Sequence, residues 1–189
     1  AVPVFETFND LAIILFSTNN TPLKWNQTGN VATLGGSPQA GRGSVAHVNR
    51  LHIWGANATP STIYYSPYGD PETWSGSDSG QYTIDNDDGD RVICCKSHKD
   101  RLIVWKGPNK GSLWIVDGKS PADIQKHKLI TGNPIQGPND AVVVGDDIWF
   151  LTRSGAYSLS ATEKYGNFAQ ADLTRYHKGF FRNTVNLNQ

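Results

Sequence analysis

Four short apolar segments recur along this chain, and each follows a polar pair of the kind found in tight turns. They begin at positions 11, 51, 102 and 148, so the repeat spans about 40 to 50 residues. In each repeat a second apolar segment follows after a polar turn, and in three repeats another one precedes. Units of this length with three or four strands are typical of the blades of a β-propeller. The first segments are 11–15, 51–54, 102–105 and 148–151, the following ones are 22–25, 62–65, 112–116 and 155–159, and the preceding ones are 44–48, 91–95 and 140–144.

The composition agrees with an all-β fold of short strands. Six Trp, seven Tyr and seven Phe stand beside 19 Gly and 10 Pro, a mixture that favours strands joined by tight turns. A helical turn is expected only over 120–128, where Ser120 can cap and Pro121 can take the first helical position. One blade cannot bury both of its faces alone, which explains strands that are apolar on both sides. We therefore expect a β-propeller with about four blade-like repeats over residues 1–174. A β-sandwich or an irregular barrel with coincidental spacing is the alternative.

The number of blades in the complete ring is a separate question. Four repeats either close into a small ring or form an arc of a larger one, completed by further residues or by another copy. The sequence contains no Met and begins with Ala1, so we expect a processed chain or a piece of a longer polypeptide. An open arc would leave two blade edges uncovered, which proteins usually avoid.

Charge and motif content exclude several classes of function. Lys+Arg and Asp+Glu are both 17, so a globally basic nucleic-acid binder is not expected. The longest purely apolar run, 11–16, is far shorter than the roughly 20 residues that span a bilayer. Adjacent Cys94 and Cys95 point to opposite faces of a strand and indicate no disulfide scaffold. The histidines lack metal-ligand spacing, and no nucleophile-elbow motif occurs, so we expect no enzyme.

The strongest charge feature is the acidic segment 85–90. Four carboxylates in six residues could bind Ca²⁺ through oxygen ligands. The EF-hand register fails, however, because its sixth position is an Asp instead of Gly and its twelfth is Lys96 instead of Glu. An acidic turn between blades, with Gly89 at positive φ, is the favoured interpretation. We therefore expect no cofactor, and Ca²⁺ is the alternative. The four carboxylates belong to Asp85, Asp87, Asp88 and Asp90.

Aromatic residues outside the expected strands are candidates for contacts with partners. Two of them lie in a loop rich in Pro, Gly and Ser, where they could stack on sugar rings or pack on a protein. The C-terminal segment 175–189 is basic and aromatic and contains no carboxylate. We expect it to dock onto a neighbouring subunit through its paired phenylalanines, in preference to nucleic acid. The residues expected to contact partners are Tyr68, Trp74, Phe180, Phe181 and Arg182.

The order of the motifs between Asn49 and Leu159 resembles that of the β-propeller structural proteins of tailed bacteriophage virions. The motifs are the loop 66–74, the turn Asp88-Gly89-Asp90, the strand 102–106 and the hairpin 150–159. The resemblance implies a non-catalytic tail, nozzle or hub component of the virion that assembles in several copies with other virion proteins. A carbohydrate-binding, lectin-like β-propeller is the alternative, based on the loop aromatics.

Overall fold

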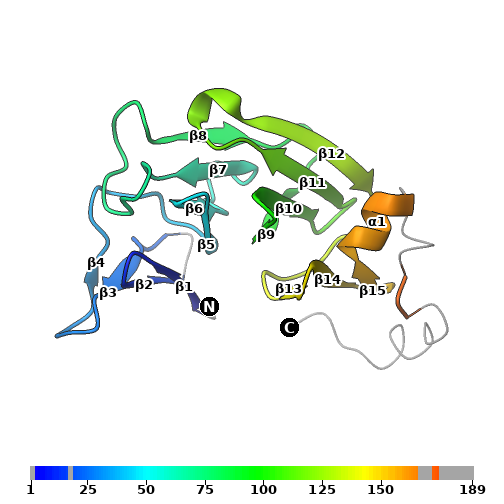
Figure 1. Cartoon of the computed structure of the whole chain (residues 1–189), viewed down its shortest axis with the longest axis horizontal. Helices are drawn as coiled ribbons and strands as arrows, with labels where there is room; N and C mark the ends of the chain where they lie inside the picture. The colour runs from blue at the N-terminus through cyan, green and yellow to red at the C-terminus, as the bar shows by residue number, and fades with distance from the viewer. Residues whose placement is uncertain (1–2, 17–18, 166–171, 175–189) are drawn as a thin grey trace.

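The computed structural model describes residues 3–16, 19–165 and 172–174, and it shows an all-β chain. Four antiparallel sheets are arranged as the blades of a four-bladed β-propeller, with strands β1, β5, β9 and β13 innermost (Figure 1). The expected all-β fold and its four blade-like repeats are thus confirmed. No helix in the described part of the chain is long and apolar enough to cross a membrane.

Each blade is a meander in which consecutive strands pair. Blade 1 contains β1 (Val4–Phe8), β2 (Leu11–Leu15), β3 (Leu23–Trp25) and β4 (Ala32–Thr33). Blade 2 contains β5 (Gly43–His47), β6 (Arg50–Trp54), β7 (Thr62–Tyr65) and β8 (Gly80–Thr83). Blade 3 contains β9 (Arg91–His98), β10 (Arg101–Gly107), β11 (Ser112–Asp117) and β12 (Gln125–Thr131). Blade 4 contains β13 (Ala141–Val144), β14 (Asp147–Thr152) and β15 (Gly155–Ser158).

Two local assignments from the sequence need correction. The expected helical turn over 120–128 is limited to a 3₁₀ turn at Pro121–Asp123, and β12 begins at Gln125. The first four side chains of β12 are exposed, because an outermost strand faces solvent, so no apolar pattern marks it. Leu159 does not end a strand but begins the helix α1 (Leu159–Tyr165).

Blade 4 is completed in an unusual way. After α1, Asp172 forms a bridge with Tyr157 on β15, and the amide of Leu173 donates to the carbonyl of Ala156 at 2.9 Å. Residues 172–174 therefore take the place that a fourth strand holds in the other blades. The predicted C-terminal tail at 175–189, including Phe180, Phe181 and Arg182, lies outside the described residues.

The second strand of each blade sets which side chains face which neighbour. In β6, Leu51 and Ile53 join the cluster shared with blade 1, whereas Trp54 joins the cluster shared with blade 3. We call the side that packs on the next blade along the chain the forward face, and the opposite side the rear face. Because strand side chains alternate, both faces can be apolar at once. The forward-face residues are Ile13 and Leu15, His52 and Trp54, Ile103 and Trp105, and Trp149 and Leu151.

This equivalence is set by the hairpin turn between the first two strands of each blade. In the first three turns both central residues have positive φ, the conformation of a type I′ turn. The strands then pair from the residues that flank the turn, such as Phe8 with Leu11 and His47 with Arg50. Leu11 in blade 1 is therefore equivalent to Arg50 in blade 2, whereas the starts of the apolar segments would align Leu11 with Leu51. The four turns are 9–10, 48–49, 99–100 and 145–146.

Hydrophobic clusters join successive blades. One lies between blades 1 and 2, a second between blades 2 and 3, and a third between blades 3 and 4. Within the described ranges, no such cluster joins blade 4 to blade 1. The forward face of blade 4 and the rear face of blade 1 therefore stay uncovered by the described residues.

Candidate functional site

The loop between β7 and β8, residues 66–79, carries two of the predicted contact residues, and its start is fixed on blade 2. The amide of Ser66 donates to the carbonyl of Leu51 at 2.9 Å, and the hydroxyl of Ser66 accepts from the amide of Leu51 at 3.0 Å. The amide of Gly69 donates to the carbonyl of Asn49 at 2.7 Å. The first residues of the loop, 66–69, thus stay hydrogen-bonded to the chain at Asn49 and Leu51 beyond the end of β7.

A buried arginine ties the two limbs of this loop together. One terminal nitrogen of Arg50 donates to the carbonyls of Ser66 at 3.1 Å and Asp78 at 2.5 Å. The other donates to the Asp78 carboxylate at 2.6 Å, and that carboxylate accepts from the amide of Tyr68 at 2.9 Å. The hydrogen bonds from Arg50 and from the Tyr68 amide hold the pKa of Asp78 below its usual value. The backbone of Tyr68 is therefore held in place from both sides.

The same loop also contacts blade 1. The Glu72 carboxylate forms an ion pair with Lys24 on β3 and accepts from the amide of Gly35 at 3.2 Å. Gly36 has a φ of 72°, and a Cβ at this position would lie 2.3 Å from the carbonyl oxygen of Glu72. Only glycine therefore lets the two backbones approach this closely. The loop bridges blades 1 and 2 and is fixed by both.

The two loop aromatics have different environments. Trp74 is half-buried, packs on the cluster between blades 1 and 2, and donates its ring N–H to the carbonyl of Pro71 at 2.7 Å. Tyr68 is 62% exposed. Tyr68 thus presents a free ring on a fixed backbone, whereas much of Trp74 is used in packing. A partner contact by either residue stays a prediction.

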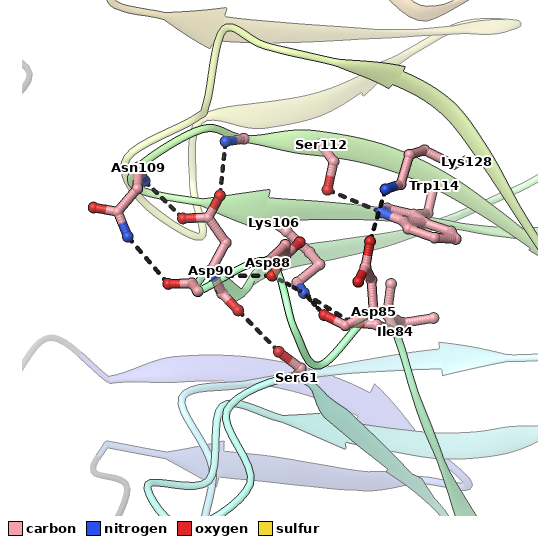
Figure 2. A network of polar contacts seen from close by, with 12 residues as sticks. Ser61, Ile84, Asp85, Asp88, Asp90, Lys106, Asn109, Ser112, Trp114 and Lys128 are labelled. Carbon is pink, nitrogen blue, oxygen red and sulfur yellow. Dashed lines mark hydrogen bonds and ion pairs between the residues drawn. The ribbon is translucent and has the colours of Figure 1, made fainter.

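The acidic segment surrounds a buried lysine at the end of β10 (Figure 2). Lys106 is fully buried, and its ammonium pairs with the Asp88 carboxylate at 2.6 Å. The same ammonium donates to the carbonyl of Ile84 at 2.8 Å and to that of Asp85. Lys106 is the position at which the apolar strand of blade 3 meets the connection from blade 2, so this ion pair joins the two blades.

Two other carboxylates of the segment, those of Asp85 and Asp90, point to other partners (Figure 2). Asp85 pairs with Lys128 on β12 at 2.7 Å, and this contact keeps the pKa of Asp85 below its usual value. Asp90 accepts from the amides of Asn109 at 2.7 Å and Gly111 at 2.8 Å. Among the residues described, no three His, Cys, Asp or Glu side chains converge as metal ligands.

The geometry therefore fits the interpretation of the segment as a turn between blades. Gly89 has the positive φ, 74°, that this interpretation expected. The structure gives no support for a calcium site at Asp85, Asp87, Asp88 and Asp90, since two lysine ammonium groups and backbone amides hold the oxygens of three of them.

A cluster of buried rings lies between blades 2 and 3. His47 and His52 meet edge to face at 5.6 Å between ring centres, and Tyr65 and Tyr82 lie beside them. His47 also shares a hydrogen bond of 2.9 Å with the hydroxyl of Ser97 on β9. Burial lowers the pKa of His47 to about 4 and that of His52 to about 3. These rings help to line a cavity of about 20 Å³, room for one water molecule. Nδ1 of His52 is buried and has no hydrogen-bond partner among the described residues.

No sequence motif marks this cluster, because its members come from four different strands. Both histidines are neutral at ordinary pH and closed in by aromatic rings, so they serve as packing residues between the blades. The cavity is too small for an organic substrate.

Comparison with known proteins identifies the class of fold. No protein-family model matches the chain, and no curated protein matches it. One similar solved structure is the extracellular domain of a protein described as a hybrid two-component system of B. thetaiotaomicron, with a TM-score of 0.54 and 11% identity. The match covers 82% of this chain and 20% of that one, so the chain spans about a fifth of the length of its structural neighbour. At this identity the similarity shows the fold alone: the chain is a β-propeller.

Proposed function

We propose that this protein is a non-catalytic β-propeller module of a tailed-phage virion, located in the tail region. Its role is to bind neighbouring virion proteins in a multi-copy assembly. The support for the virion part is the order of the loop, turn, strand and hairpin motifs between Asn49 and Leu159. The observation that carries the binding part is the fixed loop 66–79 with its exposed Tyr68.

The loop suits binding because its ordering cost is already met in the free protein. Arg50, Asp78 and Glu72 hold its backbone on two blades before any partner arrives. Immobilising a flexible side chain on binding costs about 0.5–1.5 kcal/mol, and a tyrosine with two torsions on a fixed backbone is at the low end of that range. Tyrosine is also among the residues that most often dominate interface energy.

Two measurements test this proposal. Mass spectrometry of purified virions, encoded by the genome that carries this gene, should detect the chain at a fixed stoichiometry. The full-length protein should also bind immobilised proteins of the disrupted virion, and Tyr68→Ala should weaken that binding by about 30-fold, or about 2 kcal/mol. Val31→Ala is the matched control, because Val31 is also exposed but belongs to blade 1 and not to the loop.

The two parts of the proposal can fail separately. Absence of the chain from the virion would remove the phage assignment and leave the loop as a binding site for another partner. Equal binding by Tyr68→Ala and Val31→Ala would remove the loop and leave the virion assignment.

The second candidate function is carbohydrate binding. The exposed ring of Tyr68 on a fixed backbone is the observation that favours it, because such a ring can stack on a sugar face. A glycan array with the full chain should then show saturable binding that Tyr68→Ala abolishes. Binding that survives this change, or no binding to any glycan, rules the candidate out.

A further inference from the structure

Every internal junction between blades uses the same strand positions. The forward face of one blade supplies residues equivalent to Ile103 and Trp105, which are 1% and 2% exposed. The rear face of the next blade supplies residues equivalent to Ile148 and Phe150, which are equally buried. A junction therefore has two apolar halves, and each half is recognised by its position in the hairpin.

Blade 4 carries a forward half that nothing in the described chain covers. Trp149, the equivalent of Ile103, is 46% exposed, and it pairs across the hairpin with Val142, which is 56% exposed. Val144 lies two residues further along the same face and is exposed as well. Three exposed, uncharged, β-branched or aromatic side chains on one sheet face are unusual for a surface that stays in water.

Blade 1 carries the corresponding rear half. Phe5 is 64% exposed and pairs with Ile14, which is the equivalent of the fully buried Ile53 in blade 2. Trp25 is exposed on the same face, next to Ala12, and Leu23 pairs with Ile14 from the other side. The strand residues on this face carry no charge, whereas the forward face of blade 4 also holds Asp147, whose carboxylate accepts from the hydroxyl of Ser158 at 2.5 Å.

We propose that the forward face of blade 4 binds the rear face of blade 1 of a second copy of this chain, head to tail. The two faces are the two halves of one blade junction, and among the described residues each of them lacks its matching half. A second copy is the partner that supplies it with the same strand positions as the three junctions already present. A head-to-tail contact of this kind closes into a ring or continues as a helical assembly.

The contact is independent of loop 66–79, so it can fail without affecting the proposed function, and the reverse also holds. Tyr68 lies on neither face, which makes Tyr68→Glu the matched control for placing a charge on an exposed aromatic position.

The test uses two full-length variants, each blocked on one face. Trp149→Glu places a charge in the forward face of blade 4, and Phe5→Glu places one in the rear face of blade 1. In analytical ultracentrifugation the wild-type chain and Tyr68→Glu should associate with rising concentration. Each blocked variant alone should sediment as a monomer, because neither retains both halves of the junction. An equal mixture of the two should again associate, through the intact face of each, and stop at a one-to-one dimer.

Several outcomes would overturn the inference. These are a wild-type chain that stays monomeric at every concentration, a blocked variant that associates like the wild type, or a mixture that fails to form the dimer. Loss of association in Tyr68→Glu would also overturn it, because the contact would then involve the loop. Val142→Glu serves as a second forward-face variant, and far-UV circular dichroism confirms that each variant is folded.

Discussion

Replacing Lys106 by methionine is the most direct test of how blades 2 and 3 are joined. Methionine keeps the length and the apolar stem of the side chain but removes the ammonium. The change leaves the Asp88 carboxylate and the carbonyls of Ile84 and Asp85 without their shared donor. Removing one partner of a buried ion pair typically costs about 3–5 kcal/mol. Asp88 keeps some access to water and still accepts from the amide of Asp90 at 2.9 Å, so we expect a loss of about 3 kcal/mol.

Urea unfolding, followed by tryptophan fluorescence, measures this loss in the free energy of unfolding. Lys128→Met is the matched control, because Lys128 also pairs with an aspartate of the same turn but lies on the surface. A surface pair contributes about 1 kcal/mol or less. Asp88→Asn completes a double-mutant cycle, in which the loss in Lys106→Met should shrink once the carboxylate is gone. If Lys106→Met costs no more than Lys128→Met, the buried lysine does not join the blades and the reasoning is wrong.

Three further predictions address the other parts of the structure. The folded-state pKa values of His47 and His52, about 4 and 3, lie below the ordinary value of 6.5. At pH values between the folded-state and the ordinary pKa, the unfolded chain therefore binds more protons than the folded chain. Stability is then fully present above pH 6.5 and falls as the pH drops toward 4, and His52→Phe should flatten this part of the urea-midpoint profile. Val48 has a φ of 46°, which is strained for a β-branched residue, so Val48→Asn should raise the free energy of unfolding by about 1 kcal/mol. Trp74→Ala should lower the melting temperature, with a loss of about 2 kcal/mol, whereas Tyr68→Ala should leave it unchanged.

The inner part of each blade could be predicted from the sequence, and the outer part could not. The central strands lie against a neighbouring blade on both sides, so they are apolar throughout and follow a turn. The outermost strands β4, β8 and β12 have one side in water. In β12 this gives Lys126 and Lys128 at alternate positions, and the local signal of Ser120-Pro121 then suggests a helix. A 3₁₀ turn does form over three residues, Pro121–Asp123, and the chain then pairs with β11 as a strand.

The candidate site shows a similar limit. The acidic segment was visible in the sequence, but its partner was not, because Lys106 follows Trp105 and resembles an ordinary polar strand end. Arg50 likewise belongs to a polar pair that precedes an apolar segment, yet its side chain is buried and organises a loop 28 residues away at Asp78. Charged side chains become structural when they are buried beside an opposite charge, and burial depends on which strands are neighbours. One sequence signal could have identified the ion pair. It is a lysine at the end of an apolar strand that follows an acidic turn in the same repeat.

The register of blade 1 explains why the turn is a better guide than the first apolar residue. An alignment of Leu11 with Leu51 makes Ile13 the equivalent of Ile53. In the structure, however, Ile13 lies on the forward face of blade 1 and Ile53 on the rear face of blade 2. A shift of one residue in a strand moves every side chain to the other face. That alignment would assign Ile13 to the uncovered rear face of blade 1 and Ile14 to the core. The paired positive φ values at 9–10 and 48–49 instead align Leu11 with Arg50, and only this alignment leaves Phe5 and Ile14 on the open face. Because both faces of a blade are apolar, hydrophobicity cannot distinguish them, and the backbone of the turn must do so.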